Sequence, residues 1–145
     1  LTGSHPWNTI QDMGVTQPPS AFDFDAFLGF LEKNGHNFVR LWRFELAHWT
    51  GWNEKEAPLR FTAQHPWKRT GPGAALDGLP KFDFAQWDDV HFERLRARVQ
   101  AAQRHGIYVS IMLFEGWCLR ISPSSWPGHP MNAANNINGM TWLTA

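Results

Sequence analysis

The chain has 145 residues, 43% hydrophobic and 18% charged, which suffices for one packed domain and excludes disorder as its main state. Thirteen Lys and Arg residues balance thirteen Asp and Glu residues, so charge gives no reason to expect nucleic acid or an acidic membrane as a partner. No apolar run approaches a membrane span, and the single cysteine, Cys118, excludes an internal disulfide.

The first forty residues predict a strand end, a polar and aromatic turn, and a helix. Residues 1–12 open with an expected strand end, after which Ser4, His5, Trp7 and Asn8 cluster around Pro6. A helix should begin after Ser20 or Asp23 as N-cap and stop at Gly35. One apolar helical stripe supports it, formed by Phe24, Phe27, Leu28 and Leu31.

The segment His36–Glu45 predicts a strand that is apolar at its start and carries charged and aromatic groups at its end. Side chains alternate across a strand, so Arg40 and Trp42 should share one face while Arg43 and Glu45 share the other. A buried Arg needs a carboxylate or several carbonyls around it, and such a charge often orients a catalytic group.

Residues 46–82 are rich in Trp, Pro and Gly, and we expect a long irregular insertion that folds over a site. A second helix should run from near Asp88 to about His105, with Phe92, Leu95, Val99 and Ala102 as its apolar positions and the arginines on the remaining face.

A third strand is predicted after the second helix. The run Ile107–Phe114 is nearly continuously apolar, as in a parallel strand covered on both faces, and Glu115-Gly116-Trp117 terminates it. The remainder is rich in Pro, Ser, Gly and Asn; asparagines suit turns and sugar hydroxyls alike.

This order of strands and helices predicts a parallel sheet, because parallel strands need crossover connections. Helix-to-strand joins are short, whereas the strand-to-helix loops are long and carry Trp, His, Asn and Glu. That asymmetry is typical of a (β/α)8 TIM barrel, whose sites lie at the carboxyl ends of the strands. An open doubly wound sheet has the same property, but no G-x-G-x-x-G follows a strand here.

A family resemblance adds to this interpretation. The segment Asn37-Phe38-Val39-Arg40-Leu41-Trp42 resembles the second-strand segment of cellulase-like (clan A type) (β/α)8 glycoside hydrolases, where N-x-V-R places an Arg near the catalytic carboxylates. The segments Gly3–Asn8 and Phe114–Trp117 are similar to strand ends of a bacterial glycosidase branch of that superfamily. Many such enzymes end the third strand in His, where this chain has Phe114-Glu115.

The resemblance implies a retaining glycosidase with two catalytic glutamates, an acid/base and a nucleophile, at the ends of the fourth and seventh strands. This chain would stop before the fourth strand, so both glutamates are expected beyond Ala145. Residues 1–145 would then be the N-terminal part of one incomplete barrel, poorly stable and catalytically silent alone.

Such a chain would bind a carbohydrate substrate without a cofactor, in a secreted or periplasmic protein. The expected substrate-binding residues are His5, Trp7, Asn8, Arg40, Trp42, Arg43, Glu45, Glu115 and Trp117.

Several alternatives remain open from the sequence. Glu45 and Glu115 could bind sugar hydroxyls, pair with Arg40 and Arg43, or form a catalytic pair themselves. The pair Asn53-Glu54 resembles a catalytic Asn-Glu only as a bare dipeptide. The tryptophans could stack on sugar rings or pack as core. A non-catalytic carbohydrate-binding barrel and a metal-dependent barrel hydrolase are the rival functions, although the seven His show no H-x-H or H-E-x-x-H spacing.

Overall fold

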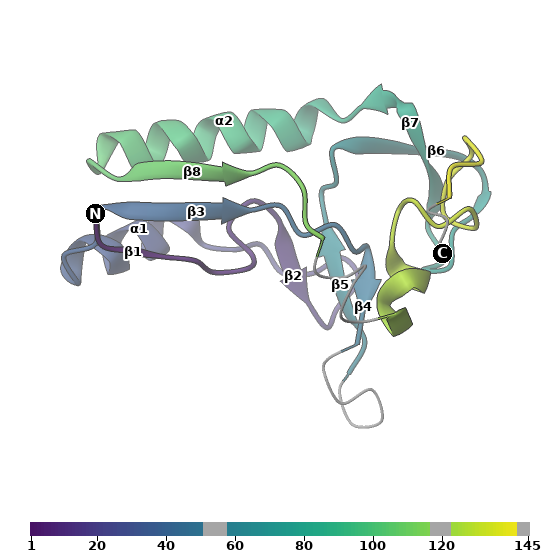
Figure 1. Cartoon of the computed structure of the whole chain (residues 1–145), viewed down its shortest axis with the longest axis horizontal. Helices are drawn as coiled ribbons and strands as arrows, with labels where there is room; N and C mark the ends of the chain where they lie inside the picture. Colours follow the sequence, from purple (N-terminus) through teal and green to yellow (C-terminus); the bar gives the residue numbers. More distant parts are fainter. Residues whose placement is uncertain (51–57, 117–122, 142–145) are drawn as a thin grey trace.

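The computed structural model describes residues 1–50, 58–116 and 123–141, and these form two α-helices, one 3-10 helix and three small sheets (Figure 1). The elements in chain order are β1 (Gly3–Ser4), β2 (Asp12–Gly14), α1 (Phe24–Lys33), β3 (Phe38–Trp42), β4 (His48–Trp49), β5 (Arg60–Ala63), β6 (Trp67–Ala74), β7 (Pro80–Trp87), α2 (Asp89–Arg104), β8 (Tyr108–Met112) and η1 (Pro123–Gly128).

The first sheet is parallel and has the order β1-β3-β8. Ser4 pairs with Val39, and Val39 in turn pairs with Val109 on the other side of β3. Helix α1 connects β1 to β3 and helix α2 precedes β8, as the crossover rule for parallel strands requires. The predicted parallel arrangement of these three strands is therefore present.

The expected partial (β/α)8 TIM barrel is wrong. Residues 46–82, expected to be an irregular insertion, instead contain β4, β5, β6 and the start of β7. Strands β4 and β5 join β2 in one antiparallel sheet of order β2-β5-β4, and β6 and β7 form an antiparallel hairpin. These pairings satisfy backbone polar groups of the segment, through the hairpin itself and through the distant strand β2. The described residues thus form a small mixed α/β domain, with the parallel sheet and helices at one end and the antiparallel sheets at the other (Figure 1).

Both predicted helices are present, with the end signals that the sequence indicated. The Asp23 side chain accepts a hydrogen bond from the backbone N–H of Ala26, and Asp88 accepts one from Val90. Gly35 and Gly106, just beyond the two C-termini, have φ of 69° and 65°. Neither of these described helices combines the length and apolar character needed to cross a membrane.

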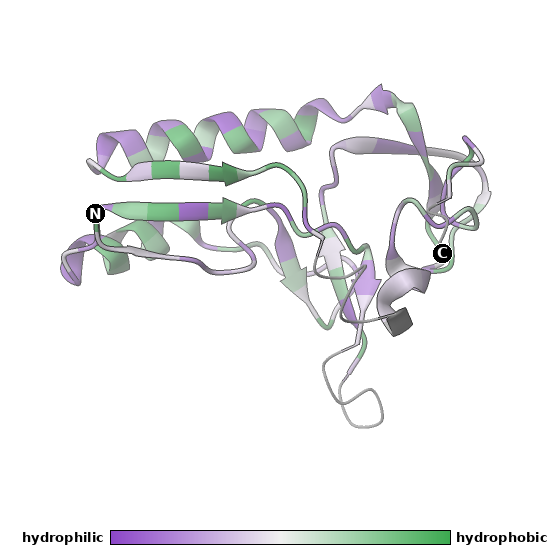
Figure 2. Cartoon of the chain, in the orientation of Figure 1, coloured by the Kyte–Doolittle hydropathy of each residue, from purple (hydrophilic) through white to green (hydrophobic). Residues whose placement is uncertain are grey.

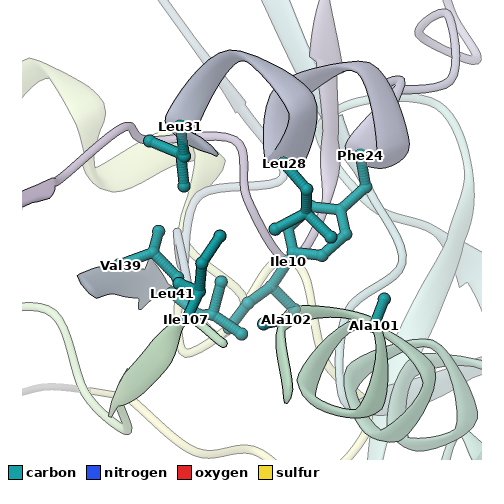
Figure 3. Close-up of a cluster of buried hydrophobic side chains, with 9 residues drawn as sticks. All are labelled: Ile10, Phe24, Leu28, Leu31, Val39, Leu41, Ala101, Ala102 and Ile107. Atoms are coloured by element: carbon teal, nitrogen blue, oxygen red, sulfur yellow. The ribbon is translucent and has the colours of Figure 1, made fainter. Parts of the chain in front are cut away.

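One hydrophobic core fills the space between the helices and the parallel sheet (Figure 3). Leu28 and Leu31 of α1 and Ala102 of α2 pack with Val39 and Leu41, which project from the same face of β3. Figure 2 shows hydrophobic residues along β3 and β8, whereas hydrophobic and hydrophilic residues alternate along α2. The helices therefore cover one face of the sheet, and Arg40 is exposed on the other.

Two polar side chains of α2, Arg98 and His91, are buried, and for Arg98 this contradicts the expectation that the arginines lie on the face opposite the apolar one. Arg98 donates from Nη1 to the carbonyl oxygen of Thr9 at 2.7 Å and stacks over Phe24 at 5.1 Å. Burial, followed by the charge of Arg94, lowers the pKa of Arg98 to about 10. His91 donates from Nδ1 to the carbonyl oxygen of Gln64 at 2.8 Å. Thr9 and Gln64, the residues that accept these hydrogen bonds, are far from α2 in the sequence. The periodicity of the helix therefore could not show that Arg98 and His91 are buried.

Two glycines provide a matched test of the packing. A Cβ at Gly128 would overlap the carbonyl oxygen of His48. At the same contact the backbone N–H of Ala47 donates to the carbonyl oxygen of Gly128 at 2.7 Å. A Cβ at Gly29 in α1 would meet nothing within 4 Å. We predict that Gly128→Ala lowers the free energy of unfolding by about 1–3 kcal/mol or more, because η1 must move away from β4. Gly29→Ala should raise it by about 0.5–1 kcal/mol, because glycine is a poor helix former. Urea unfolding measures both, and equal effects would contradict the packing of η1 on β4.

Candidate functional site

The predicted site residues that the structure describes gather near the carboxyl ends of β1, β3 and β8, and most of them separate onto two faces. One face carries His5, Trp7, Arg40 and Trp42, which we call the strand-end surface. The other carries Arg43, Glu45, Glu115 and His129, which we call the ionic cluster. Arg40 and Trp42 thus lie on one face and Arg43 and Glu45 on the other, as the alternation of side chains along β3 predicts.

Side chains from residues 9–11 hold the end of β3 in place. The Thr9 hydroxyl accepts a hydrogen bond from the backbone N–H of Trp42 at 3.2 Å, and Gln11 Oε1 accepts one from Phe44 at 2.8 Å. Thr9 and Gln11 are themselves fully buried. These bonds replace strand pairing beyond β1 and keep the chain extended as it passes from the surface residues to the ionic cluster.

The ionic cluster joins three distant parts of the chain. Arg43 forms an ion pair through Nη2 with Glu45 Oε1 and donates from Nε to the carbonyl oxygen of Leu113 at 2.8 Å. His129 Nε2 lies 3.2 Å from Glu45 Oε2. Arg43, Glu45 and Glu115 are 8%, 6% and 2% exposed, so water does not screen their interactions effectively.

Arg43 is the cation that two carboxylates share. Burial lowers the pKa of Arg43, while the charges of Glu45 and Glu115 oppose that shift. Its guanidinium also lies over the rings of Trp67 and Phe114, with centroid distances of 5.4 and 5.6 Å. The carboxylates proposed as partners for the strand arginines therefore surround Arg43, whereas Arg40 is exposed.

His129 was not identified from the sequence. Its Nδ1 accepts a hydrogen bond from the backbone N–H of Met131 at 3.0 Å, so in the neutral ring the hydrogen is on Nε2 and is donated to Glu45. The ring also stacks on Trp126 at 5.3 Å. A single His in a Pro-rich segment, far from Glu45 in the chain, offered no local signal for this contact.

The strand-end surface combines aromatic rings with polar groups. His5 is exposed and stacks on Trp42 with centroids 4.8 Å apart and planes inclined by 24°, and Trp7 meets Trp42 edge-on at 5.5 Å. Burial, followed by the nearby charge of Arg40, lowers the pKa of His5. A neutral imidazole can both donate and accept a hydrogen bond, and here it covers the indole that is 8% exposed.

The structure distinguishes between two roles for the tryptophans. Trp49 is buried with Phe44 and Leu46 in a second hydrophobic cluster, against which Trp7 packs, so Trp49 is a core residue. Asn8, the remaining candidate of the first turn, is half-buried.

Three of the expectations fall on residues outside the described ranges. They concern Trp117 as a sugar-binding residue, the pair Asn53-Glu54, and the C-terminal Ala145, beyond which the acid/base and the nucleophile were expected. The position of the catalytic glutamates after Ala145 therefore stays a prediction. The two glutamates that the structure does describe near the strand ends, Glu45 and Glu115, belong to the ionic cluster.

The described asparagines of the last segment stabilise turns and strand contacts. Asn135 accepts through Oδ1 from the backbone N–H of Leu76 at 2.8 Å and donates to the carbonyl oxygen of Pro127 at 2.7 Å. Asn138 accepts from Phe84 at 2.8 Å. Of the two roles considered for these asparagines, they therefore perform the structural one.

In residues 1–50, 58–116 and 123–141, no group of three or more His, Cys, Asp and Glu side chains is arranged to hold a metal ion. Comparisons of the chain with protein-family models, curated proteins and solved structures found no match. The geometry of the chain itself is therefore the basis for a functional proposal.

Arg43 offers a direct test of the ionic cluster. We predict that Arg43→Met lowers the free energy of unfolding by about 3–5 kcal/mol, because two buried carboxylates then lack their cation. The same replacement at exposed Arg40 should change it by less than about 0.5 kcal/mol. Chemical denaturation of both variants measures the difference. Equal values would show that the cluster contributes little to stability.

Two buried histidines predict a loss of stability in acid. Burial lowers the pKa of His65 well below its ordinary value of 6.5 and, to a lesser degree, lowers that of His91. Below about pH 6.5 the unfolded chain binds protons at these rings that the folded chain does not, so stability falls by up to about 1.4 kcal/mol per pH unit for each ring. The loss continues until the pH reaches the folded-state pKa values.

Urea unfolding between pH 7.5 and pH 5 would measure this dependence. His65→Gln and His91→Asn retain the donors that bind the carbonyl oxygens of Thr62 and Gln64 but cannot titrate. Each should reduce the slope of stability against pH by the contribution of one proton. An unchanged slope in both variants would contradict the assignment of these rings as neutral in the folded chain.

Proposed function

We propose that this chain binds carbohydrate at the strand-end surface, as the substrate-binding part of a glycoside hydrolase whose acid/base and nucleophile lie beyond Ala145. The observation that carries the proposal is the meeting of His5, Trp7, Arg40 and Trp42 at the ends of β1 and β3. Aromatic faces beside hydrogen-bonding groups suit a sugar ring, which has apolar C–H faces and polar edges.

Each residue of this surface has a separate part in the proposal. His5 and Arg40 are exposed and supply hydrogen bonds to hydroxyl groups. Trp7 is half-buried and presents part of its ring. Trp42, almost fully buried beneath His5, keeps the imidazole in position. Arg40 is also the Arg of the N-x-V-R segment, which would orient a glutamate supplied from elsewhere.

The ionic cluster supports this surface from the opposite face. Glu45 is held by Arg43 and His129, and Glu115 is 2% exposed, so neither carboxylate is placed to attack an anomeric carbon. Their part in the proposal is to fix the ends of β3 and β8 rather than to break the glycosidic bond. The same observation favours a non-catalytic carbohydrate-binding protein as the second candidate.

Binding can be tested on the chain with soluble oligosaccharides of glucose, xylose and mannose, using nuclear magnetic resonance shifts of the indole N–H groups. We predict binding that His5→Ala and Arg40→Ala each weaken by about tenfold, the value of one lost hydrogen bond to a charged or polar group. The matched control is Arg96→Ala on the exposed face of α2, which should bind as the parent chain does.

Two outcomes would contradict separate parts of the proposal. Absence of binding to any of these oligosaccharides by a folded chain would remove carbohydrate as the ligand of the strand-end surface. Turnover of aryl glycosides that disappears in Glu45→Gln or Glu115→Gln would show that these carboxylates are catalytic after all. Binding without turnover is the expected result.

A further inference from the structure

A cavity lies away from the strand-end surface, lined by residues of the sheet β2-β5-β4 and of the hairpin β6-β7. Its volume is about 410 Å³, within the range of roughly 300–1,000 Å³ typical of small-molecule sites. The lining includes Pro19, Thr62, Gln64, His65, Trp67 and Asp77. None of these residues belongs to the strand-end surface or to the ionic cluster.

Three lining positions at the end of β5 carry polar atoms without a hydrogen-bond partner in the described structure. They are the hydroxyl of Thr62, the Oε1 atom of Gln64 and the Nδ1 atom of His65. Thr62 and His65 are each 5% exposed. Buried polar groups in folded proteins are nearly always paired, so three such atoms along one wall indicate groups that a ligand would satisfy.

Two of these three atoms can only accept a hydrogen bond, whereas the Thr62 hydroxyl can donate or accept. His65 donates from Nε2 to the carbonyl oxygen of Thr62 at 3.1 Å, which leaves a lone pair on Nδ1 of the neutral ring. Burial, followed by the charge of Arg69, holds the pKa of His65 low and keeps the ring neutral. The amide oxygen of Gln64 is an acceptor by its chemistry. The complementary ligand must therefore donate hydrogen bonds.

The backbone at Gln64 is held in an unusual conformation. Its φ is 68°, and it is the only non-glycine residue with positive φ in the described part of the chain. The carbonyl group of Gln64 accepts the hydrogen bond from His91 Nδ1 of α2 at 2.8 Å, which fixes this peptide. Such strained positions cluster at ligand sites, where the surrounding structure maintains them.

The charged groups of the cavity lining have partners within the protein. Arg69 binds Asp77 through both terminal nitrogens, at 3.1 and 2.5 Å, and its guanidinium lies 3.9 Å from the ring centroid of Phe82. Asp88 caps α2 by accepting from Val90. A neutral ligand therefore suits this wall better than an ion does, because an ion would compete with these existing contacts.

We propose that this cavity binds a small neutral saccharide of one or two rings. Its hydroxyl groups donate to His65 Nδ1 and Gln64 Oε1 and exchange a hydrogen bond with Thr62, while Trp67 and Phe61 of the lining face its C–H groups. All three unpaired atoms are buried beneath the cavity wall, so the proposal includes small rotations of the Thr62, Gln64 and His65 side chains that bring these atoms to the ligand. The site is independent of the strand-end surface.

Calorimetric titration of the chain with glucose, galactose, mannose, xylose and their disaccharides tests the proposal. At least one of these sugars should bind. Thr62→Val and Gln64→Leu should each raise its dissociation constant by about tenfold, the effect of one lost hydrogen bond. Gln100→Leu makes the same chemical change on the exposed face of α2 and should have no effect.

Stability provides the second measurement. Thr62→Val keeps the shape of the side chain and removes an unpaired buried hydroxyl, so its melting temperature should equal or exceed that of the parent chain. A Thr62→Val variant with parental affinity would overturn the proposal, whether its melting temperature rises or falls. A folded chain to which none of the sugars binds would overturn it as well.

The two carbohydrate proposals fail in distinguishable ways. If His5→Ala and Arg40→Ala weaken all saccharide binding while Thr62→Val and Gln64→Leu do not affect it, the cavity proposal is wrong and the strand-end proposal stands. The reverse pattern removes the strand-end proposal and leaves the cavity as the binding site. Independent loss of two binding events would support both.

Discussion

The ion pair between Arg43 and Glu45 is the interaction on which the arrangement of the candidate site depends. Arg43 contacts the carbonyl group of Leu113, the residue after β8, and Trp67 of β6, while Glu45 contacts His129 of the last segment. Buried charges are costly unless they are paired and hydrogen-bonded, so each of these contacts requires the others. The pair of Arg43 and Glu45 thus links the parallel sheet, the hairpin and the C-terminal segment.

The orientation of Arg43 also determines which side chains form the strand-end surface. Because side chains alternate, placing Arg43 toward the helix-covered face directs Trp42 and Phe44 to the opposite one. There Phe44 stacks with Trp7 and lies near Trp49, and this second hydrophobic cluster supports the rings of the surface. This separation of the site into two faces could be predicted from alternation alone, whereas the histidine contributed by the last segment could not.

Local chemistry limited what else the sequence could predict. The helices began where expected because the caps Asp23 and Asp88 act within a few residues. The burial of Arg98 depends on the distant carbonyl group of Thr9, and such a contact leaves no periodic signal. The barrel expectation failed for a related reason, since β6 contains Pro72 between two glycines, residues that usually interrupt strands. A hairpin of this composition resembles a loop in sequence, which is why the sequence predicts an irregular insertion there.

The hairpin also bears on how the parallel sheet can assemble. Strands β3 and β8 are far apart in the chain, and the entropy lost on joining them grows with the length of the loop between them. When Trp67 pairs with Trp87 across β6 and β7, the residues between them are held in the hairpin. The flexible loop that must close to bring β8 to β3 is then shorter. Formation of the hairpin thus reduces the entropy lost when β8 pairs with β3. The segment that the sequence predicts to be an insertion therefore makes it easier for the two longest strands of the parallel sheet to pair.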